Sequence, residues 1–302
     1  MRKKVSEKTI LKDKRETLNI HLGRNNLSAT IFVPSDCTNN CKFCTSKESY
    51  HKRKPNLEKV LKKIKKLNKI DWIHSFVLTG GEPFADLDIL QKILDTISSK
   101  KQVYVNTTLP TNRYTEDELV DFINGSRIDC INLSRHCDTF EKDKMFFSEY
   151  IAKDYIVSKL KKPVKVNSII KKDTNIKEVL DRWCKYSNVF VSFRADYRDI
   201  TKASLKDLQD DITLAILNTN KVKYLSHGGC DVCFDVNFCY KDTFYFSYHR
   251  GMEHSSILFG DELIINDVLV SQDSKLYYDW NQNKDVKLHI KKKQFVVYKN
   301  IE

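Results

Sequence analysis

Long hydrophobic runs are missing from this sequence. No stretch approaches the roughly 18 apolar residues that a membrane-spanning helix needs, and residues 1–16 are charged without the apolar core of a secretory signal. Glycine and proline are also scarce, at 8 and 5 among 302 residues, which excludes collagen-like and low-complexity architectures. We therefore expect a globular chain in the cytoplasm with no membrane partner.

Positive charge is concentrated near one end. The chain carries 52 Lys and Arg residues against 40 Asp and Glu residues, a net charge of +12. Residues 1–70 hold 19 basic and 6 acidic residues, whereas the rest of the chain holds 33 and 34 and is nearly neutral. A basic flank attracts a nucleotide, a nucleic acid or an acidic partner, although a solvated surface is the simpler interpretation.

Strand-like and helix-like patterns alternate over the first two thirds of the chain. Hydrophobic residues make up 41% of the chain, enough to build a core. The alternation predicts an α/β fold with parallel strands joined by right-handed crossovers. The predicted strands cover residues 27–34, 74–81, 102–109, 127–134, 164–170 and 189–195, and the predicted helices cover 57–70, 86–99, 115–125, 141–161 and 175–186. Beyond residue 220 we expect short strands with turns, and hence a domain boundary near residues 200–222.

Three cysteines stand close together just after the first predicted strand. Cys37, Cys41 and Cys44 fall within eight residues, and a chain without a secretory signal does not use its nine cysteines as a disulfide framework. Three thiolates on one loop can hold one face of a metal cluster. A four-iron cluster held by three cysteines leaves one iron open for another ligand. A structural zinc site is the alternative, with His51 as the nearest fourth ligand.

A second motif, Thr79-Gly80-Gly81-Glu82-Pro83, follows the second predicted strand. Paired glycines at the end of a strand let the backbone approach a ligand closely. The carboxylate of Glu82 is able to accept a hydrogen bond from an ammonium group. The glycine motif alone is a weak turn signal, but the order of the two motifs along the chain is highly specific.

In this order, the two motifs resemble the signature of the radical S-adenosylmethionine (radical SAM) superfamily. The aromatic residue that the superfamily places before the last cysteine is Phe43 here. The resemblance covers residues 27–200 and implies a partial (β/α)6 TIM-like barrel, here with a small C-terminal β-rich extension. It also implies a [4Fe–4S] cluster on three thiolates and S-adenosylmethionine held at the glycine motif; the residues concerned are Cys37, Cys41, Cys44, Gly80, Gly81 and Glu82.

Polar residues near the ends of later strands are further candidates for contacts with S-adenosylmethionine. Ser134 and Arg135 end the fourth predicted strand, where a hydroxyl and a guanidinium could meet the ribose or the carboxylate. Asn167 lies on the fifth, where members of the superfamily often place a contact to the ribose. The alternative for each is an ordinary polar residue at a barrel mouth.

The second group of cysteines, Cys230, Cys233 and Cys239, lies in the C-terminal segment. Its C-x2-C-x5-C spacing resembles part of the SPASM/twitch extensions, which hold auxiliary iron–sulfur clusters. The fuller pattern has another cysteine where this chain has Thr243, so we expect at most one auxiliary [4Fe–4S] cluster. Zinc and a metal-free role are the alternatives. The fourth iron of such a cluster would be open to the substrate, or would be bound by Cys184, His227 or His249.

These observations predict three segments: a basic N-terminal segment (1–26), a radical SAM partial barrel (27–200) and a C-terminal extension (201–302). The resemblance implies an enzyme that cleaves S-adenosylmethionine reductively and removes a hydrogen atom from a substrate, with an electron donor such as flavodoxin or ferredoxin. We expect a polar small molecule or a nucleotide as the substrate, and a ribosomally made peptide as the alternative. A zinc-stabilised nucleic-acid-binding protein is the remote alternative.

Overall fold

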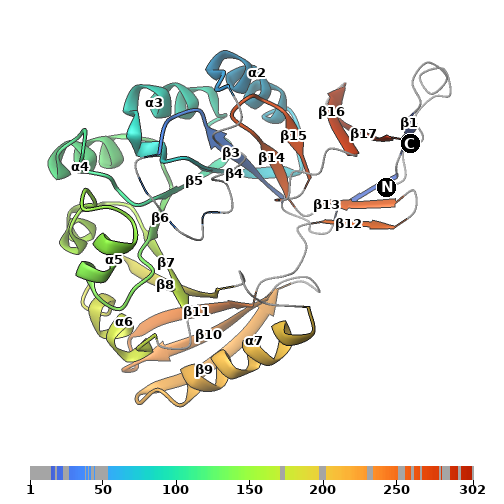
Figure 1. Ribbon diagram of the computed structural model, residues 1–302. Helices are drawn as coiled ribbons and strands as arrows, with labels where there is room; N and C mark the ends of the chain where they lie inside the picture. The colour runs from blue at the N-terminus through green and yellow to red at the C-terminus, as the bar shows by residue number, and fades with distance from the viewer. Residues whose placement is uncertain are drawn as a thin grey trace. The chain divides into compact units, whose positions relative to one another are not determined.

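The chain is described here from a computed structural model (Figure 1). It describes residues 15–17, 19–22, 27–37, 39, 41, 44, 54–170, 174–196, 202–229, 234–250, 256–259, 262–265, 267–278, 280, 286–291 and 294–300. Three predicted site residues, Phe43, Cys230 and Cys233, lie outside these ranges. Within them, no helix combines the length and the apolar character that crossing a bilayer requires.

The chain divides into two compact units. Unit 1 comprises Met1–Asp36, Ser46–Tyr104 and His254–Glu302, and unit 2 comprises Cys37–Thr45 and Val105–Glu253. Strand β5 (Gln102–Thr107) carries the chain from one unit to the other.

Unit 1 is built on the parallel pair β3 (Leu27–Val33) and β4 (Ile73–Gly80), joined by a crossover that contains helix α2 (Leu57–Leu67). Strand β14 (Val268–Val270) adds to β3 in parallel, and β15 (Leu276–Tyr277) pairs with β14. After β4 come the short helix η2 (Pro83–Ala85) and helix α3 (Leu87–Thr96). Two small sheets complete this unit: β1 (Arg15–Thr17), β17 (Gln294–Asn300) and β16 (Val286–Lys291); and β12 (Ser256–Phe259), β13 (Glu262–Ile265) and β2 (Asn19–Leu22).

Helix α2 shows why the sequence folds this way locally. Val60, Ile64 and Leu67 are buried at helical spacing, and lysines occupy most of the opposite face. The side chain of Asn56 accepts a hydrogen bond from Lys59 N at 3.0 Å and caps the first turn.

Unit 2 contains the parallel strands β6 (Cys130–Ser134), β7 (Val164–Ile170), β8 (Val189–Ala195) and β11 (Phe244–Arg250). Strand β10 (Phe234–Tyr240) pairs antiparallel with β11, and β9 (Val222–Gly229) with β10. The helices of this unit are α4 (Glu116–Gly125), α5 (Phe140–Phe146), η3 (Asp154–Lys159), α6 (Ile176–Trp183) and α7 (Lys202–Leu217). In Figure 1, α5, α6 and α7 lie along one side of the strands of this unit.

The structure confirms the predicted alternation of six strands with helices, but it corrects the helix expected over residues 141–161. Helix α5 ends at Phe146, and η3 begins only at Asp154. Between them the backbone is extended: Ile151 forms a β-bridge with Pro110, and Ala152 N donates to Leu109 O at 2.8 Å. These bonds tie the segment to the loop after β5, which a continuous helix would not allow.

Candidate functional site

The glycine motif is bonded to the residues that follow β3, directly before Cys37. Ser35 Oγ donates a hydrogen bond to the carbonyl oxygen of Glu82 at 2.9 Å, and Glu82 N donates to the carbonyl oxygen of Asp36 at 3.3 Å. Asp36 is the residue immediately before Cys37. The glycine-rich turn is therefore bonded directly to the start of the cysteine loop.

Gly80 ends β4 with a left-handed φ of +120°. A Cβ at this position would lie 2.9 Å from Val33 N and 3.0 Å from Phe32 Cα on β3. Only glycine accommodates both the positive φ and this close approach of two backbones. The backbone geometry therefore requires glycine at position 80 whether or not a ligand binds.

Glu82 is buried, with 2% of its surface exposed. Its Oε1 accepts a hydrogen bond from Phe84 N at 3.1 Å and caps helix η2. An ionised carboxylate offers about four acceptor positions, so this cap is compatible with a further bond to an ammonium donor. Gly81, next to it, is half-buried.

The cysteine loop rests against the segment that follows β5. Asn39 Nδ2 donates to Thr108 Oγ1 at 3.0 Å, and Cys44 N donates to Cys41 O at 3.3 Å. Asn39 Oδ1 is buried and has no hydrogen-bond partner among the described residues. Cys37 and Cys41 are half-buried, and Cys44 is exposed.

The donor set of this loop fits an iron–sulfur cluster in type and number. Cys37, Cys41 and Cys44 form no disulfide among the described residues, and cysteine thiolates are the usual ligands of iron–sulfur clusters. Within the described ranges, however, no three Cys, His, Asp or Glu side chains converge as ligands of one metal. Cluster binding therefore requires the loop to gather its three thiols.

Ser134 and Asn167 are register partners on β6 and β7, so their side chains share one face of the sheet. Asn167 Oδ1 is buried, and no other described residue bonds to it. An orphaned amide oxygen of this kind is suited to accept a hydrogen bond from a hydroxyl of a ligand. Ser134 is half-buried beside it.

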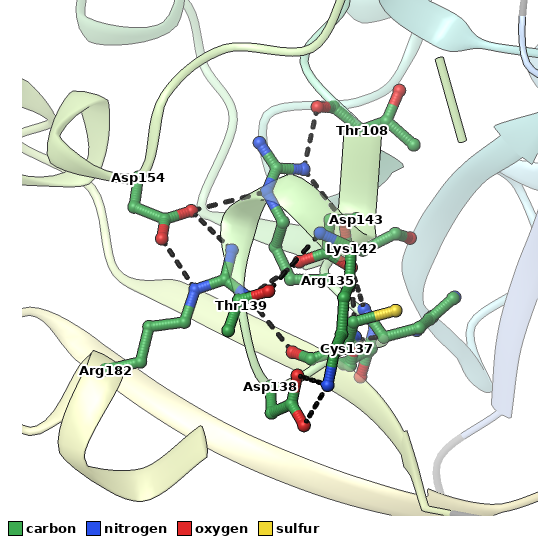
Figure 2. A network of polar contacts seen from close by, with 12 residues as sticks. Thr108, Arg135, Cys137, Asp138, Thr139, Lys142, Asp143, Asp154 and Arg182 are labelled. Atoms are coloured by element: carbon green, nitrogen blue, oxygen red, sulfur yellow. Dashed lines mark hydrogen bonds and ion pairs between the residues drawn. The ribbon is translucent and has the colours of Figure 1, made fainter. Parts of the chain in front are cut away.

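Arg135, predicted as a cofactor contact, has protein partners instead (Figure 2). Its guanidinium is fully buried; Nη1 donates to the carbonyl oxygens of Thr108 and Ser134 at 3.0 and 2.8 Å, and Nη2 to that of Ala152 at 2.7 Å. Its Nε lies 3.6 Å from Asp154 Oδ1. Burial lowers the pKa of Arg135, against the effect of the nearby carboxylates. Because the guanidinium is fully buried and both Nη atoms donate to carbonyl oxygens, we leave Arg135 out of the proposed cofactor site.

Arg182, on α6, completes this polar network (Figure 2). It contacts Asp143 Oδ2 at 2.7 Å through Nη1 and Asp154 Oδ2 at 2.6 Å through Nε. The other oxygen of Asp143 accepts bonds from the backbone N–H groups of His136 and Cys137 at 2.7 and 3.0 Å. The network thus holds the loop that follows β6. Sequence reasoning missed it; a weak signal was available in Asp143, an acid on the apolar side of a short helix.

The second cysteine motif is described only at Cys239, which is buried in β10 with 5% of its surface exposed. Five residue steps of extended strand, about 17 Å, separate Cys239 from Phe234, the sequence neighbour of Cys233. Cys233 and Cys230 lie outside the described residues, so the metal site at Cys230, Cys233 and Cys239 stays a prediction.

Comparisons with known proteins agree with the first two motifs. Residues 31–146 match the model of the radical SAM superfamily. No curated protein sequence matches the chain. The α/β fold resembles several solved structures, and this likeness confirms the predicted fold class.

Two of these structures are of SuiB from Streptococcus suis. SuiB bound to the precursor peptide SuiA has 12% identity, and the match covers 83% of this chain and 58% of that one, with a TM-score of 0.53. SuiB bound to S-adenosylmethionine has 13% identity, coverages of 83% and 59%, and a TM-score of 0.52. Coproporphyrinogen III oxidase (HemN) from Escherichia coli has 12% identity, coverages of 88% and 67%, and a TM-score of 0.45. The match thus spans less than two thirds of the SuiB chains.

Proposed function

We propose that this chain, which carries a domain of the radical SAM superfamily, is an enzyme that binds a [4Fe–4S] cluster at Cys37, Cys41 and Cys44 and S-adenosylmethionine next to it. When bound, these cofactors supply a 5′-deoxyadenosyl radical that removes a hydrogen atom from a substrate. The observation that carries the proposal is the pair of bonds joining Glu82 to Ser35 and Asp36, directly before the cysteine loop.

The chain's own residues have separate tasks in this proposal. Gly81 and Glu82 would hold the methionine end of S-adenosylmethionine, through backbone groups and the carboxylate. Asn167 and Ser134 would bind its ribose, because both are polar residues on one face and Asn167 Oδ1 lacks a partner among the described residues. Asn39 would keep the cysteine loop against Thr108. These positions are consistent with ligand binding at the carboxyl ends of parallel strands.

For the substrate we propose a polar small molecule or a nucleotide, supported by charged side chains on the sheet of unit 2 that are described below. A peptide is the second candidate. One observation favours it: β9 is the last strand in the order of its sheet and exposes Tyr224 and Leu225, at 49% and 47%. An extended peptide adds to such an edge through backbone hydrogen bonds and side-chain contacts. An external one-electron donor such as flavodoxin or ferredoxin is part of either proposal.

The test is Cys41→Ala, with Cys130→Ala as the matched control. Cys130 is also half-buried, but it lies at the start of β6, outside both cysteine motifs. After anaerobic reconstitution we expect wild type to hold at least about four irons per chain and to form 5′-deoxyadenosine with S-adenosylmethionine and dithionite. Cys41→Ala should lose this product and Cys130→Ala should keep it. Full product formation by Cys41→Ala would overturn the proposal.

The same iron measurement examines the second cysteine motif. About eight irons in wild type, falling to about four in a Cys37/Cys41/Cys44→Ala variant, would support an auxiliary cluster formed with Cys230 and Cys233. About four irons falling to none would leave one cluster. Zinc without iron in wild type would end the radical SAM assignment of the site.

A further inference from the structure

Four titratable side chains from four neighbouring strands share one face of the sheet in unit 2. Arg194 on β8 is the register partner of His249 on β11, which is in turn the partner of Asp235 on β10. Lys165 on β7 is the register partner of Phe190 on β8. Phe190 lies four residues before Arg194, and side chains an even number of residues apart share one face of a strand, so Lys165 lies on the same face as Arg194. We call Lys165, Arg194, Asp235 and His249 the charged row.

The opposite face of these strands is apolar. Val166, Val191 and Phe246 are fully or almost fully buried and alternate with the residues of the charged row. By contrast, Arg194 is exposed, and Lys165 and His249 are half-buried. One face therefore forms the core, and the other carries charge that the packing of the core does not require.

Asp235 and His249 form an oriented pair. His249 Nδ1 lies 2.9 Å from Asp235 Oδ1, with the imidazole 23% exposed. Burial lowers the pKa of His249 despite the hydrogen bond to Asp235, so the ring is neutral at pH 7. Burial alone would raise the pKa of Asp235, but the hydrogen bond from His249, together with the nearby cations Lys165 and Arg194, lowers the pKa. A neutral ring that donates Nδ1–H to the carboxylate presents Nε2 as an acceptor.

Lys165 and Arg194 place positive charge next to this pair. Burial lowers the pKa of Lys165, and the neighbouring charge of Arg194 lowers it further, while Asp235 acts in the opposite direction. A half-buried ammonium beside a guanidinium is costly to keep charged. A bound anion removes much of this cost through charge-assisted hydrogen bonds to both groups.

We propose that Lys165 and Arg194, with the Asp235–His249 pair beside them, form the subsite that binds an anionic group of the substrate, a carboxylate or a phosphate. The inference rests on the proposed function, in which Asn167 is a cofactor contact. Asn167 lies on the same face of β7 as Lys165, two residues away. The anionic end of the substrate would thus bind beside the cofactor contact. The acceptor nitrogen of His249 is suited to a hydroxyl or amine donor on the same molecule.

The subsite is tested by anion binding, which needs no turnover. The reconstituted full-length protein is titrated with inorganic phosphate and, separately, with succinate at constant ionic strength, since salt screens exposed charges. Calorimetry measures affinity. The variants are Lys165→Met, Arg194→Gln and Lys165→Arg, which keeps the charge. Lys223→Gln is the matched control, because Lys223 is an exposed lysine of unit 2 paired with Asp242.

We expect saturable binding of one of the two anions to wild type and to Lys223→Gln. Lys165→Met and Arg194→Gln should each weaken it about tenfold or more, the contribution of one charge-assisted hydrogen bond, and Lys165→Arg should restore part of it. Preference for phosphate or for succinate identifies the anionic group. No saturable binding to wild type, or the same affinity in all variants, would overturn the subsite.

Iron content and thermal unfolding are measured on the same samples. A variant that loses anion binding but keeps its iron and its melting temperature supports the subsite, because neither the cluster nor the fold has failed. Wild type that binds the anion but holds no iron would reject the proposed radical chemistry and leave the subsite standing. The two proposals therefore fail in different measurements.

Discussion

At the residue scale, Gly80 combines backbone geometry with function. Its φ of +120° and the 2.9 Å approach of a Cβ to Val33 N place it where β4 turns away from β3. The turn leads directly into Gly81 and Glu82, the proposed cofactor contacts. A strained position that only glycine relieves thus directs the backbone toward the site.

We predict that Gly80→Ala lowers the free energy of unfolding by about 1–3 kcal/mol, because alanine is strained at this φ and its Cβ contacts the backbone of β3. The control is Gly125→Ala at the end of α4, where a Cβ meets nothing within 4 Å and the effect should stay below about 1 kcal/mol. Urea denaturation measures both. Equal stability of the two variants would show that the β3–β4 contact tolerates a side chain.

At the scale of elements, buried charges connect α5, η3 and α6. Arg182 bridges Asp143 on α5 and Asp154 on η3, and its side chain is only 8% exposed. Through Asp154, the network reaches Arg135 and the carbonyl oxygen of Thr108. Since Thr108 also receives the bond from Asn39, the network extends to the cysteine loop.

We predict that Arg182→Met destabilises the protein by about 3–5 kcal/mol, because two carboxylates lose their main cation inside the fold. Lys159→Met is the control. Lys159 forms an ion pair of similar length, 2.8 Å with Asp117, but the two side chains are 40% and 82% exposed, so its loss should cost less than about 1 kcal/mol. Thermal or urea unfolding decides; similar losses in both variants would contradict a buried role for Arg182.

At the scale of the whole molecule, the C-terminal segment contributes strands to both units. Strand β11 joins β8 in unit 2, and β14 joins β3 in unit 1. Leu269 on β14 is fully buried and forms a core cluster with Phe32 and Tyr277. The strand that leads into the cysteine loop is therefore packed against residues more than 230 positions away in the sequence.

We predict that Leu269→Ala destabilises the protein by about 2–5 kcal/mol, through lost burial and the cavity that remains. Leu225→Ala, at a leucine 47% exposed on β9, should change stability by less than about 0.5 kcal/mol. Denaturant titration of both variants compares them. An effect of Leu269→Ala as small as that of the control would mean that β14 adds little to the core of unit 1.

The sequence by itself determined the local structure and the first two motifs. Hydrophobic periodicity predicted the six alternating strands and the helix over residues 115–125, which the structure begins with a capping box of Thr115 and Glu118. The spacing of Cys37, Cys41 and Cys44, and the order of the glycine motif after it, indicated the family because these signals are short-range. Residues close together in the sequence are sufficient to identify these signals.

Only the tertiary structure decided the partners of residues that are distant in sequence. The sequence indicates only that Arg135 follows a predicted strand and that Arg182 lies in a predicted helix. Their carboxylate and carbonyl partners depend on how the loops pack. Cys239 matches a ligand spacing, and only the structure shows that it is buried in an extended strand. The charged row exists because the register of four strands places Lys165, Arg194, Asp235 and His249 on one face. Register between strands is set by the packing of the whole sheet, and a local pattern does not contain it.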